Sequence, residues 1–302
     1  MTTCRVAERA LSCALTLMAV LSLAMVGGAS AQEPSRHAVA GMVLAVDRPS
    51  ATMLVSHDDI AGVMPAMAMP FDVRDATQLA GLEPGMSVTF TLVLGENQPP
   101  YAEQVTVVRY QSVEQDPMSA RRLRLLKQLA GAPPPEALAA GQAVPDFALT
   151  DHTGARVTLS QFRGRVVALN FIYTSCELTQ FCFRVTNHFG VVARRFAAQA
   201  GDDLVLLTVT FDPARDSPEA LRDYASQWKP DPRAWRFLTG GTSEIQRVCD
   251  LFGVDFFPDD GLMNHSLRTV IVDRQGALAA TIEGNRYSAA QLGDLIDAAL
   301  RR

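Results

Sequence analysis

Two cysteines near the middle of the chain have a spacing that is compatible with redox or metal chemistry. Cys176 and Cys182 lie in the stretch "FIYTSCELTQFCFR", with five residues between them, directly after the apolar run "VVALNF". A buried strand that leads into a cysteine turn and then a helix presents a thiol at a helix N-terminus, which stabilises the thiolate. Four roles are compatible with this pair: a structural disulfide, a zinc site, a redox pair and a copper site.

These four roles make different demands on the rest of the chain. A disulfide across so short a loop would constrain few residues and add little stability. A structural zinc site needs about four ligands, and after the N-terminal 31 residues, which contain Cys4 and Cys13, the sequence has only Cys249 besides this pair. A redox pair stays open, although thioredoxin enzymes separate their two cysteines by two residues. A copper site needs a third soft or borderline donor beside the two thiolates.

The third donor would be a histidine. His265, in "GLMNHSLRTVIVD", directly precedes an apolar strand, and a histidine at a strand mouth can reach a cysteine turn on a neighbouring strand. His188 is the competitor, six residues past Cys182 on the next predicted helix. We interpret His152, in an Asp/Gly turn, and His37 as surface residues. Residue types alone leave the choice between His265 and His188 open.

A second group of soft donors occurs in the stretch "SHDDIAGVMPAMAMPF". It contains His57, Met64, Met67 and Met69. Met67 and Met69 are two residues apart, so on a strand they share a face. Thioether and imidazole favour Cu(I) over harder divalent ions, and Ag(I) is expected to bind for the same reason. The alternative is that methionines fill a small core; we favour metal binding for Met67 and Met69 beside His57.

Three other sulfur residues of the two predicted domains have patterns typical of core positions. Met42 and Met53 are isolated on predicted strands, and Cys249 lies at helical spacing in "IQRVCDLFG". Methionine and free cysteine are both common as buried apolar side chains. We therefore expect these three residues to be buried.

The pattern of the chain predicts two domains with a linker between them. Residues 38–110 contain about five short alternating stretches, such as "VTFTLVLG", which predict a small all-β, OB-like barrel. Residues 111–140 include three consecutive prolines and read as a linker. In residues 141–302 strands alternate with helices, which favours an α/β sandwich.

Composition and the N-terminus indicate where the protein works. The chain has 302 residues and a net charge of −5, and without a basic stripe we expect no nucleic-acid partner. Arg5 and Arg9 precede an apolar run of residues 10–26, and "ASA" follows at residues 29–31. This is the pattern of a secretory signal over residues 1–31, which predicts export to the periplasm or another extracytoplasmic space. Retention of the segment would instead anchor the protein to the membrane.

Residues 38–110 resemble the CusF family of periplasmic copper-binding proteins. The resemblance rests on a strand-end histidine followed by "PAMAMPF". It implies a five-stranded OB-like barrel that binds Cu(I) or Ag(I) through His57, Met67 and Met69. Met64 stands at the position of the tryptophan that caps the metal in the family, so a thioether would replace the cap.

Residues 141–302 resemble the Sco/SenC family of copper proteins. The motifs are "VPDFALTDHTGARVTLSQFRGRVVALNFIYTSC", "TVTFDPARDSPEALRDYA" and "NHSLRTVIVDRQG". The resemblance implies a thioredoxin-like fold that binds Cu(I) or Cu(II) through Cys176, Cys182 and His265. It also implies that an aspartate of the "DPxxD" segment lies near the site, and Asp212 is the closest match.

The cysteine loop departs from the family pattern. The family has Cys-Pro-x-x-Cys-Pro, whereas here Glu177 and Phe183 replace the prolines and the loop is two residues longer. A longer loop without prolines is less constrained, which is expected to change the redox potential and loosen preorganisation. We expect copper binding itself to tolerate this change better than a specific role in copper transfer.

The two resemblances together imply an exported copper metallochaperone. Its expected role is assembly of the binuclear copper centre of a respiratory oxidase, cytochrome c oxidase. The expected partners are a copper-receiving oxidase subunit or another copper protein, and a thiol reductant. Two alternatives are a thiol–disulfide oxidoreductase, with Cys176 as nucleophile and Cys182 as resolving thiol, and a copper buffer for tolerance.

Overall fold

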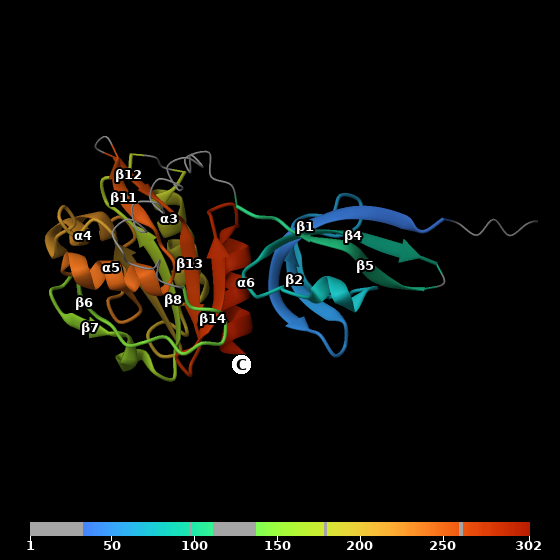
Figure 1. Ribbon diagram of the computed structural model, residues 1–302, viewed down its shortest axis with the longest axis horizontal. Helices are drawn as coiled ribbons and strands as arrows, with labels where there is room; N and C mark the ends of the chain where they lie inside the picture. Colours follow the sequence, from blue (N-terminus) through green and yellow to red (C-terminus); the bar gives the residue numbers. More distant parts are fainter. Residues whose placement is uncertain (1–32, 97, 111–136, 178–179, 260–261) are drawn as a thin grey trace, which may run out of the picture.

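The computed structural model describes residues 33–96, 98–110, 137–177, 180–259 and 262–302 (Figure 1). The expected signal peptide, residues 1–31, and most of the expected linker lie outside these ranges. Within them, no helix has the length and apolar character needed to cross a membrane.

The first domain is a five-stranded antiparallel sheet with the order β3-β2-β1-β4-β5. Its strands are β1 (Ser35–Asp47), β2 (Thr52–His57), β3 (Met67–Asp72), β4 (Ser87–Gly95) and β5 (Gln98–Val107), with the 3-10 helix η1 (Ala76–Leu79) after β3. The expected barrel is curled but not closed by a ladder between its edge strands. Instead, Val73 bridges Ala102 of β5, and the Arg74 N–H donates to the Ala102 carbonyl at 3.0 Å.

Alternation along the strands decides which side chains enter the core of this sheet. Val88, Phe90 and Leu92 of β4 are buried together, as the alternating sequence predicts. They share a core with Met53 and Val55 of β2. Met53 is fully buried there, which confirms its expected core role.

The second domain is built on a seven-stranded sheet with the order β14-β13-β8-β9-β10-β6-β7. The strands are β6 (Ala148–Asp151), β7 (Arg156–Thr158), β8 (Val166–Ile172), β9 (Leu204–Thr210), β10 (Trp235–Thr239), β13 (Arg268–Val272) and β14 (Leu278–Glu283). The helices are η2 (Leu159–Phe162), α3 (Cys182–Arg195), α4 (Pro218–Ala225), α5 (Thr242–Leu251) and α6 (Ala289–Leu300).

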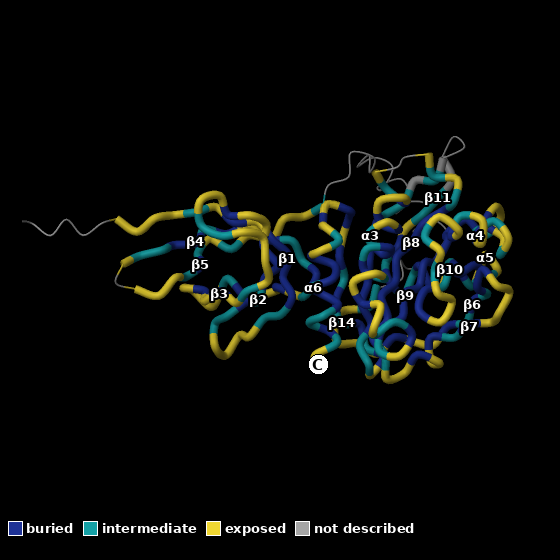
Figure 2. The backbone as a smooth tube through the Cα atoms, turned by 180° about the vertical axis from the view of Figure 1, so that it is seen from behind, coloured by how far each residue is buried: buried dark blue, intermediate teal, exposed yellow. Residues whose placement is uncertain are grey.

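The connectivity of this domain is that of a thioredoxin-like α/β sandwich. β8, β9 and β10 are parallel, with α3 between β8 and β9, and β13 and β14 add an antiparallel hairpin followed by α6. Apolar clusters fill both faces of the sheet, so its central strands are buried along their length (Figure 2). The sequence did not predict a separate hairpin of β11 (Phe256–Asp259) and β12 (Leu262–His265), which stands beside the main sheet (Figure 1).

The two domains pack directly on each other through α6. Met42 and Leu44 of β1 join an apolar cluster with Leu292 and Ile296 of α6. Figure 1 shows α6 lying along β1 and β2 at the boundary between the domains. Met42 is therefore buried as expected, but in the interface between the domains rather than in the core of the first sheet.

Polar contacts surround this apolar interface. The Ser56 hydroxyl donates to Asp294 at 2.7 Å, and the Gln291 amide donates to Asp58 at 3.1 Å.

The C-terminal end of the expected linker packs on the second domain. Leu138 contacts the core of that domain, and its N–H donates to the carbonyl of Leu251 at 3.0 Å.

Candidate functional site

The cysteine turn follows β8, whose residues are all buried. Cys176 is half-buried in the turn, and Cys182 is the buried first residue of α3. Thr174, two residues before Cys176, is held by Asp216: its N–H donates to the carboxylate at 3.1 Å and its hydroxyl donates to the same group. The Thr210 hydroxyl at the end of β9 donates to Asp216 as well. This buried carboxylate therefore fixes the entry to the cysteine turn.

The two cysteines are thiols that are not joined in a disulfide, and they interact with each other. The hydrogen bond with Cys176 raises the pKa of Cys182 well above its ordinary value, and burial adds to this rise. The position at a helix N-terminus does not outweigh these effects. At neutral pH Cys182 is therefore a protonated thiol, and binding of a metal ion to its sulfur would release the proton to solvent or to a base.

His265 is the last residue of β12 and lies against two aromatic rings. Its ring centroid is 5.7 Å from that of Tyr173 and 4.7 Å from that of Phe211. Burial lowers the pKa of His265, so the imidazole is neutral at pH 7. Nδ1 lies 3.2 Å from the Ser266 carbonyl. When Nδ1–H donates to this carbonyl, Nε2 carries the lone pair and can bind a metal.

Tyr173 connects the histidine with the thiols. Its side chain interacts with both cysteines, and burial is the largest cause that raises its pKa. Across the described residues, no three His, Cys, Asp or Glu side chains converge closely enough to hold a metal ion as they stand. Cys176, Cys182 and His265 thus each lie near Tyr173, and copper binding by all three would require a further approach of the turn and β12.

The other histidines lie elsewhere. His188 packs with its ring 5.1 Å from Tyr287, toward the opposite face of the sheet. His37 is half-buried, with Nε2 3.1 Å from the Ser35 hydroxyl. The expectation that His152 is a surface residue is wrong: it is buried, and its Nδ1 accepts the Phe237 N–H at 3.2 Å. The turn containing His152 lies against β10, and this long-range packing has no local sequence signal.

The "DPARD" segment contributes two carboxylates. Asp212, the residue expected near the site, follows Phe211 and lies 3.7 Å from Arg215, and burial with the charge of Asp216 raises its pKa. Asp216 is the one that bonds Thr174 and whose charge acts on Cys182. Our sequence interpretation did not single out Asp216, although it is the second aspartate of the same motif.

Acid is expected to destabilise the protein in part through His188. Burial lowers the pKa of His188 to about 4 from 6.5, so the folded protein keeps this imidazole neutral. The unfolded chain takes up the proton below about pH 6.5. Between these two pKa values the unfolded state binds more protons, and the free energy of unfolding therefore falls as the pH falls. We expect His188 to contribute a loss of about 1–2 kcal/mol at pH 5, measured by urea unfolding.

The matched variants for this test are His188→Phe and His37→Gln. His188→Phe should reduce the difference in unfolding free energy between pH 7 and pH 5, because the titrating group is gone. His37→Gln should leave the difference unchanged. An unaltered pH dependence in His188→Phe would contradict the prediction.

The first domain brings His57 together with two of the methionines. His57 ends β2 directly opposite Met67 of β3, and Val55 is opposite Met69. His57, Met67 and Met69 therefore lie on one face of the sheet. Met67 is 48% exposed, whereas Met69 is half-buried against the core. Met64 is half-buried in the preceding turn, where its backbone bridges Ile60.

The His57 ring has one nitrogen, Nε2, without a hydrogen-bond partner. His57 is 1% exposed and its Nδ1 lies 2.7 Å from the Asp58 carbonyl. Nε2 is buried without a hydrogen-bond partner. A buried polar atom without a partner is costly, and such atoms are rare in folded proteins. A soft metal ion bound between this nitrogen and the neighbouring thioethers would satisfy it.

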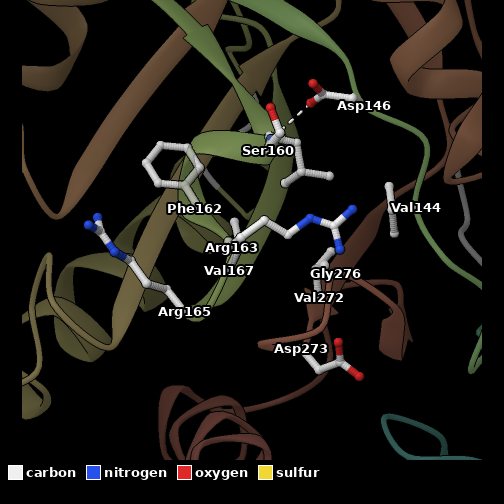
Figure 3. Close-up of a pocket in the computed structure, with 11 residues that line it drawn as sticks. Val144, Asp146, Ser160, Phe162, Arg163, Arg165, Val167, Val272, Asp273 and Gly276 are labelled. Atoms are coloured by element: carbon white, nitrogen blue, oxygen red, sulfur yellow. Dashed lines mark hydrogen bonds between the residues drawn. The ribbon is translucent and has the colours of Figure 1, made fainter.

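A pocket at the opposite end of β8 does not share these features. Figure 3 shows that Val144, Phe162, Val167 and Val272 line it and that the Arg163 side chain extends across it toward Gly276. The Ser160 N–H donates to Asp146 at 2.8 Å at its rim. No cysteine, histidine or methionine is among its lining residues. We therefore assign no copper site to it.

Both domains match models of known protein families. The SCO1/SenC family model matches residues 135–300, and the model of the copper-binding periplasmic protein CusF matches residues 36–106. Protein sco1 of Schizosaccharomyces pombe is 30% identical over 150 residues, which cover 47% of this chain and 55% of that protein. A putative copper-binding protein of Stutzerimonas stutzeri is 27% identical over 146 residues, covering 47% and 69%.

Solved structures of Sco proteins are similar to about half of this chain. The crystal structure of yeast Sco1 with copper bound is 26% identical, covers 53% of this chain and 89% of that chain, and gives a TM-score of 0.46. Bradyrhizobium japonicum ScoI with copper bound is 23% identical, covers 52% and 99%, and gives 0.45. The chain spans only about half of the S. pombe protein, so the match concerns a part of that relative. The family match covers more than half of the chain, which therefore belongs to the SCO1/SenC family and carries a CusF-like region before its thioredoxin-like domain.

Proposed function

We propose that the protein is an exported copper metallochaperone with one copper site in each domain. In the thioredoxin-like domain Cys176, Cys182 and His265 bind the metal. In the first domain His57, Met67 and Met69 bind it, with Met64 as the neighbouring thioether. The recipient is the binuclear copper centre of a respiratory oxidase, as membership of the SCO1/SenC family suggests.

One observation supports the two sites together. In both domains a histidine lies beside sulfur residues, with Nδ1 close to the carbonyl of the following residue. This arrangement leaves Nε2 for a metal, and a carbonyl partner of this kind is the usual second contact of a metal-binding histidine. Sulfur with imidazole is a donor set that suits copper.

Two other features support an exported location. The N-terminal pattern is that of a secretory signal, and the matching CusF model describes a periplasmic protein. Outside the cytoplasm thiols tend to oxidise, so a chaperone with Cys176 and Cys182 needs a thiol reductant as a partner. Retention of the N-terminal segment would anchor the chaperone at the membrane.

His265 is expected to be required for Cu(II) at the second site. His265→Ala should remove the thiolate-to-copper absorption of the Cu(II) complex, because the nitrogen donor is lost, while Cys176 and Cys182 can still form a disulfide. His188→Ala is the matched control and should keep the absorption. The reverse result for the two histidines would show that the wrong residue has been assigned.

The first-domain site is expected to discriminate between soft and harder ions. In the full chain with Cys176→Ser and Cys182→Ser, the protein should bind Cu(I) and Ag(I) but not Zn(II) at comparable strength. Adding Met67→Leu and Met69→Leu keeps the apolar volume and removes both thioethers. We expect the Cu(I) affinity to fall by about 100-fold or more, since loss of even an outer-shell partner costs 10–100-fold.

The control for this measurement is Met53→Leu, which changes a methionine in the core of the same sheet. It should leave the affinity unchanged in a titration against a competing Cu(I) chelator. Equal Cu(I) affinity of the double-leucine variant and its parent would mean that Met67 and Met69 are packing residues.

A thiol–disulfide oxidoreductase is the second candidate function. Cys176 is half-buried and Cys182 is fully buried, which is the exposure expected of an attacking and a resolving thiol. The two proposals differ in an anaerobic Cu(I) titration of the second domain in the full chain. Reduction of an oxidised copper protein without any tight Cu(I) binding would favour the oxidoreductase. A copper buffer would bind the metal at both sites but release none to a recipient protein.

A further inference from the structure

One sulfur residue beside the cysteine turn has no role in the sites described above. Met263 lies on β12, two residues before His265, so strand alternation places the two side chains on the same face. The pairing of β11 with β12 sets Phe256 opposite His265 and thereby fixes which face this is.

That face of the hairpin lies against Phe211 and Tyr173, and Tyr173 leads into the cysteine turn. Phe256 stacks on Phe211 with ring centroids 5.5 Å apart, and His265 contacts Phe211 and Tyr173. Met263 is half-buried and packs against the cluster that contains Tyr173, Phe211 and Cys182. The side chain of Met263 therefore packs against the same apolar cluster as the buried Cys182.

The backbone of Met263 is tied to the same group. Its N–H donates to the Tyr173 side chain, which in turn forms a hydrogen bond with Cys176. Met263 is therefore separated from the Cys176 thiol by a single side chain. A packing role would need only an apolar residue of similar size, whereas this position adds a polarisable sulfur on the strand face of the His265 imidazole and against the cluster that contains Cys182.

We propose that Met263 is a further copper ligand of the thioredoxin-like domain, with its thioether sulfur binding Cu(I) beside Cys176, Cys182 and His265. This inference rests on the proposed copper site of that domain. A thioether donates a lone pair without adding charge and favours Cu(I) over Cu(II). Met263→Leu should therefore lower the affinity for Cu(I) by about tenfold, in the range of a supporting ligand, and change the affinity for Cu(II) less.

The direct test labels the thioether itself. The full chain is prepared with selenomethionine and with Met64→Leu, Met67→Leu and Met69→Leu, so that the first domain has no thioether beside His57. One equivalent of Cu(I) is added to the reduced protein, and X-ray absorption is measured at the copper edge. We expect copper–selenium scattering in addition to scattering from sulfur and nitrogen, because only a methionine carries selenium.

Two further variants assign the signal. Met263→Leu should abolish the selenium scattering, whereas Met86→Leu should leave it unchanged. Bound copper with sulfur and nitrogen neighbours but no selenium would overturn the role of Met263 while leaving the proposed function intact. Selenium scattering that persists in Met263→Leu would also overturn it. Failure of the second domain to bind Cu(I) at all would instead refute the proposed function, and the inference with it.

Discussion

Replacement of Cys182 by serine is expected to lower the Cu(I) affinity of the thioredoxin-like domain by about 1000-fold or more. A thiolate ligand would be lost, and even outer-shell partners are worth 10–100-fold in metal affinity. Serine keeps the size of the buried side chain at the first position of α3, so the helix should remain intact. The measurement is anaerobic competition with a Cu(I) chelator, in the full chain with Met67→Leu and Met69→Leu.

The pH dependence of binding is a signature of the same ligand. The pKa of Cys182 is raised well above its ordinary value, so Cu(I) must displace its proton at neutral pH. The apparent Cu(I) affinity of the parent should therefore increase with pH between 6 and 8, by about tenfold per pH unit for each proton released.

Cys249→Ser is the matched control for Cys182→Ser, because Cys249 is also buried at a helix position but lies in α5. A Cys182→Ser protein that retains parental affinity would exclude Cys182 as a ligand.

Local sequence patterns predicted the elements that carry the proposed copper ligands. His57 ends β2, Met67 and Met69 share a face of β3, and Cys182 begins α3. Helix caps were also predictable, since Ser217 caps α4 with Pro218 at its first position. These features depend on neighbours within a few residues, which is the range over which alternation, helical spacing and capping act.

Features that depend on distant parts of the chain were not predictable in this way. The β11–β12 hairpin and its Met263 depend on packing over Phe211 and Tyr173. Asp216 holds the entry to the cysteine turn because it accepts a hydrogen bond from Thr174, which lies 42 residues earlier in the chain. The open edge of the first sheet and its docking on α6 likewise follow from tertiary contacts rather than from strand alternation.

Docking of the domains changes how transfer between the two sites should work. Gln291, in the first turn of α6, bonds Asp58, the residue after His57. Asn285, shortly before α6, accepts the Tyr110 hydroxyl at 3.2 Å and donates to the carbonyl of Gln180 in the cysteine loop. The surroundings of both sites therefore meet at the N-terminal end of one helix. Any transfer between the two proposed sites would therefore start from docked domains rather than from domains joined by a free linker.

Copper loaded on the first domain is expected to move to the thiols once they are reduced. Charged thiolate sulfur binds Cu(I) more strongly than the neutral thioethers of Met67 and Met69. A tenfold difference in binding constant, about 1.4 kcal/mol, would already place about 90% of the metal on the cysteines. With Cys176 and Cys182 joined in a disulfide, the thiolates are unavailable and copper should stay on His57, Met67 and Met69.

The experiment loads the oxidised full chain with one equivalent of Cu(I) and follows the metal by X-ray absorption before and after reduction of the thiols. Selenomethionine labelling separates the two sites, because copper on the first domain has selenium neighbours from Met67 and Met69. Met263→Leu is included so that selenium near the second site does not contribute. Reduction should replace this selenium scattering by sulfur scattering, and Cys176→Ser with Cys182→Ser should prevent the change. Copper that keeps its selenium neighbours after full reduction of the parent would contradict transfer and indicate two independent storage sites.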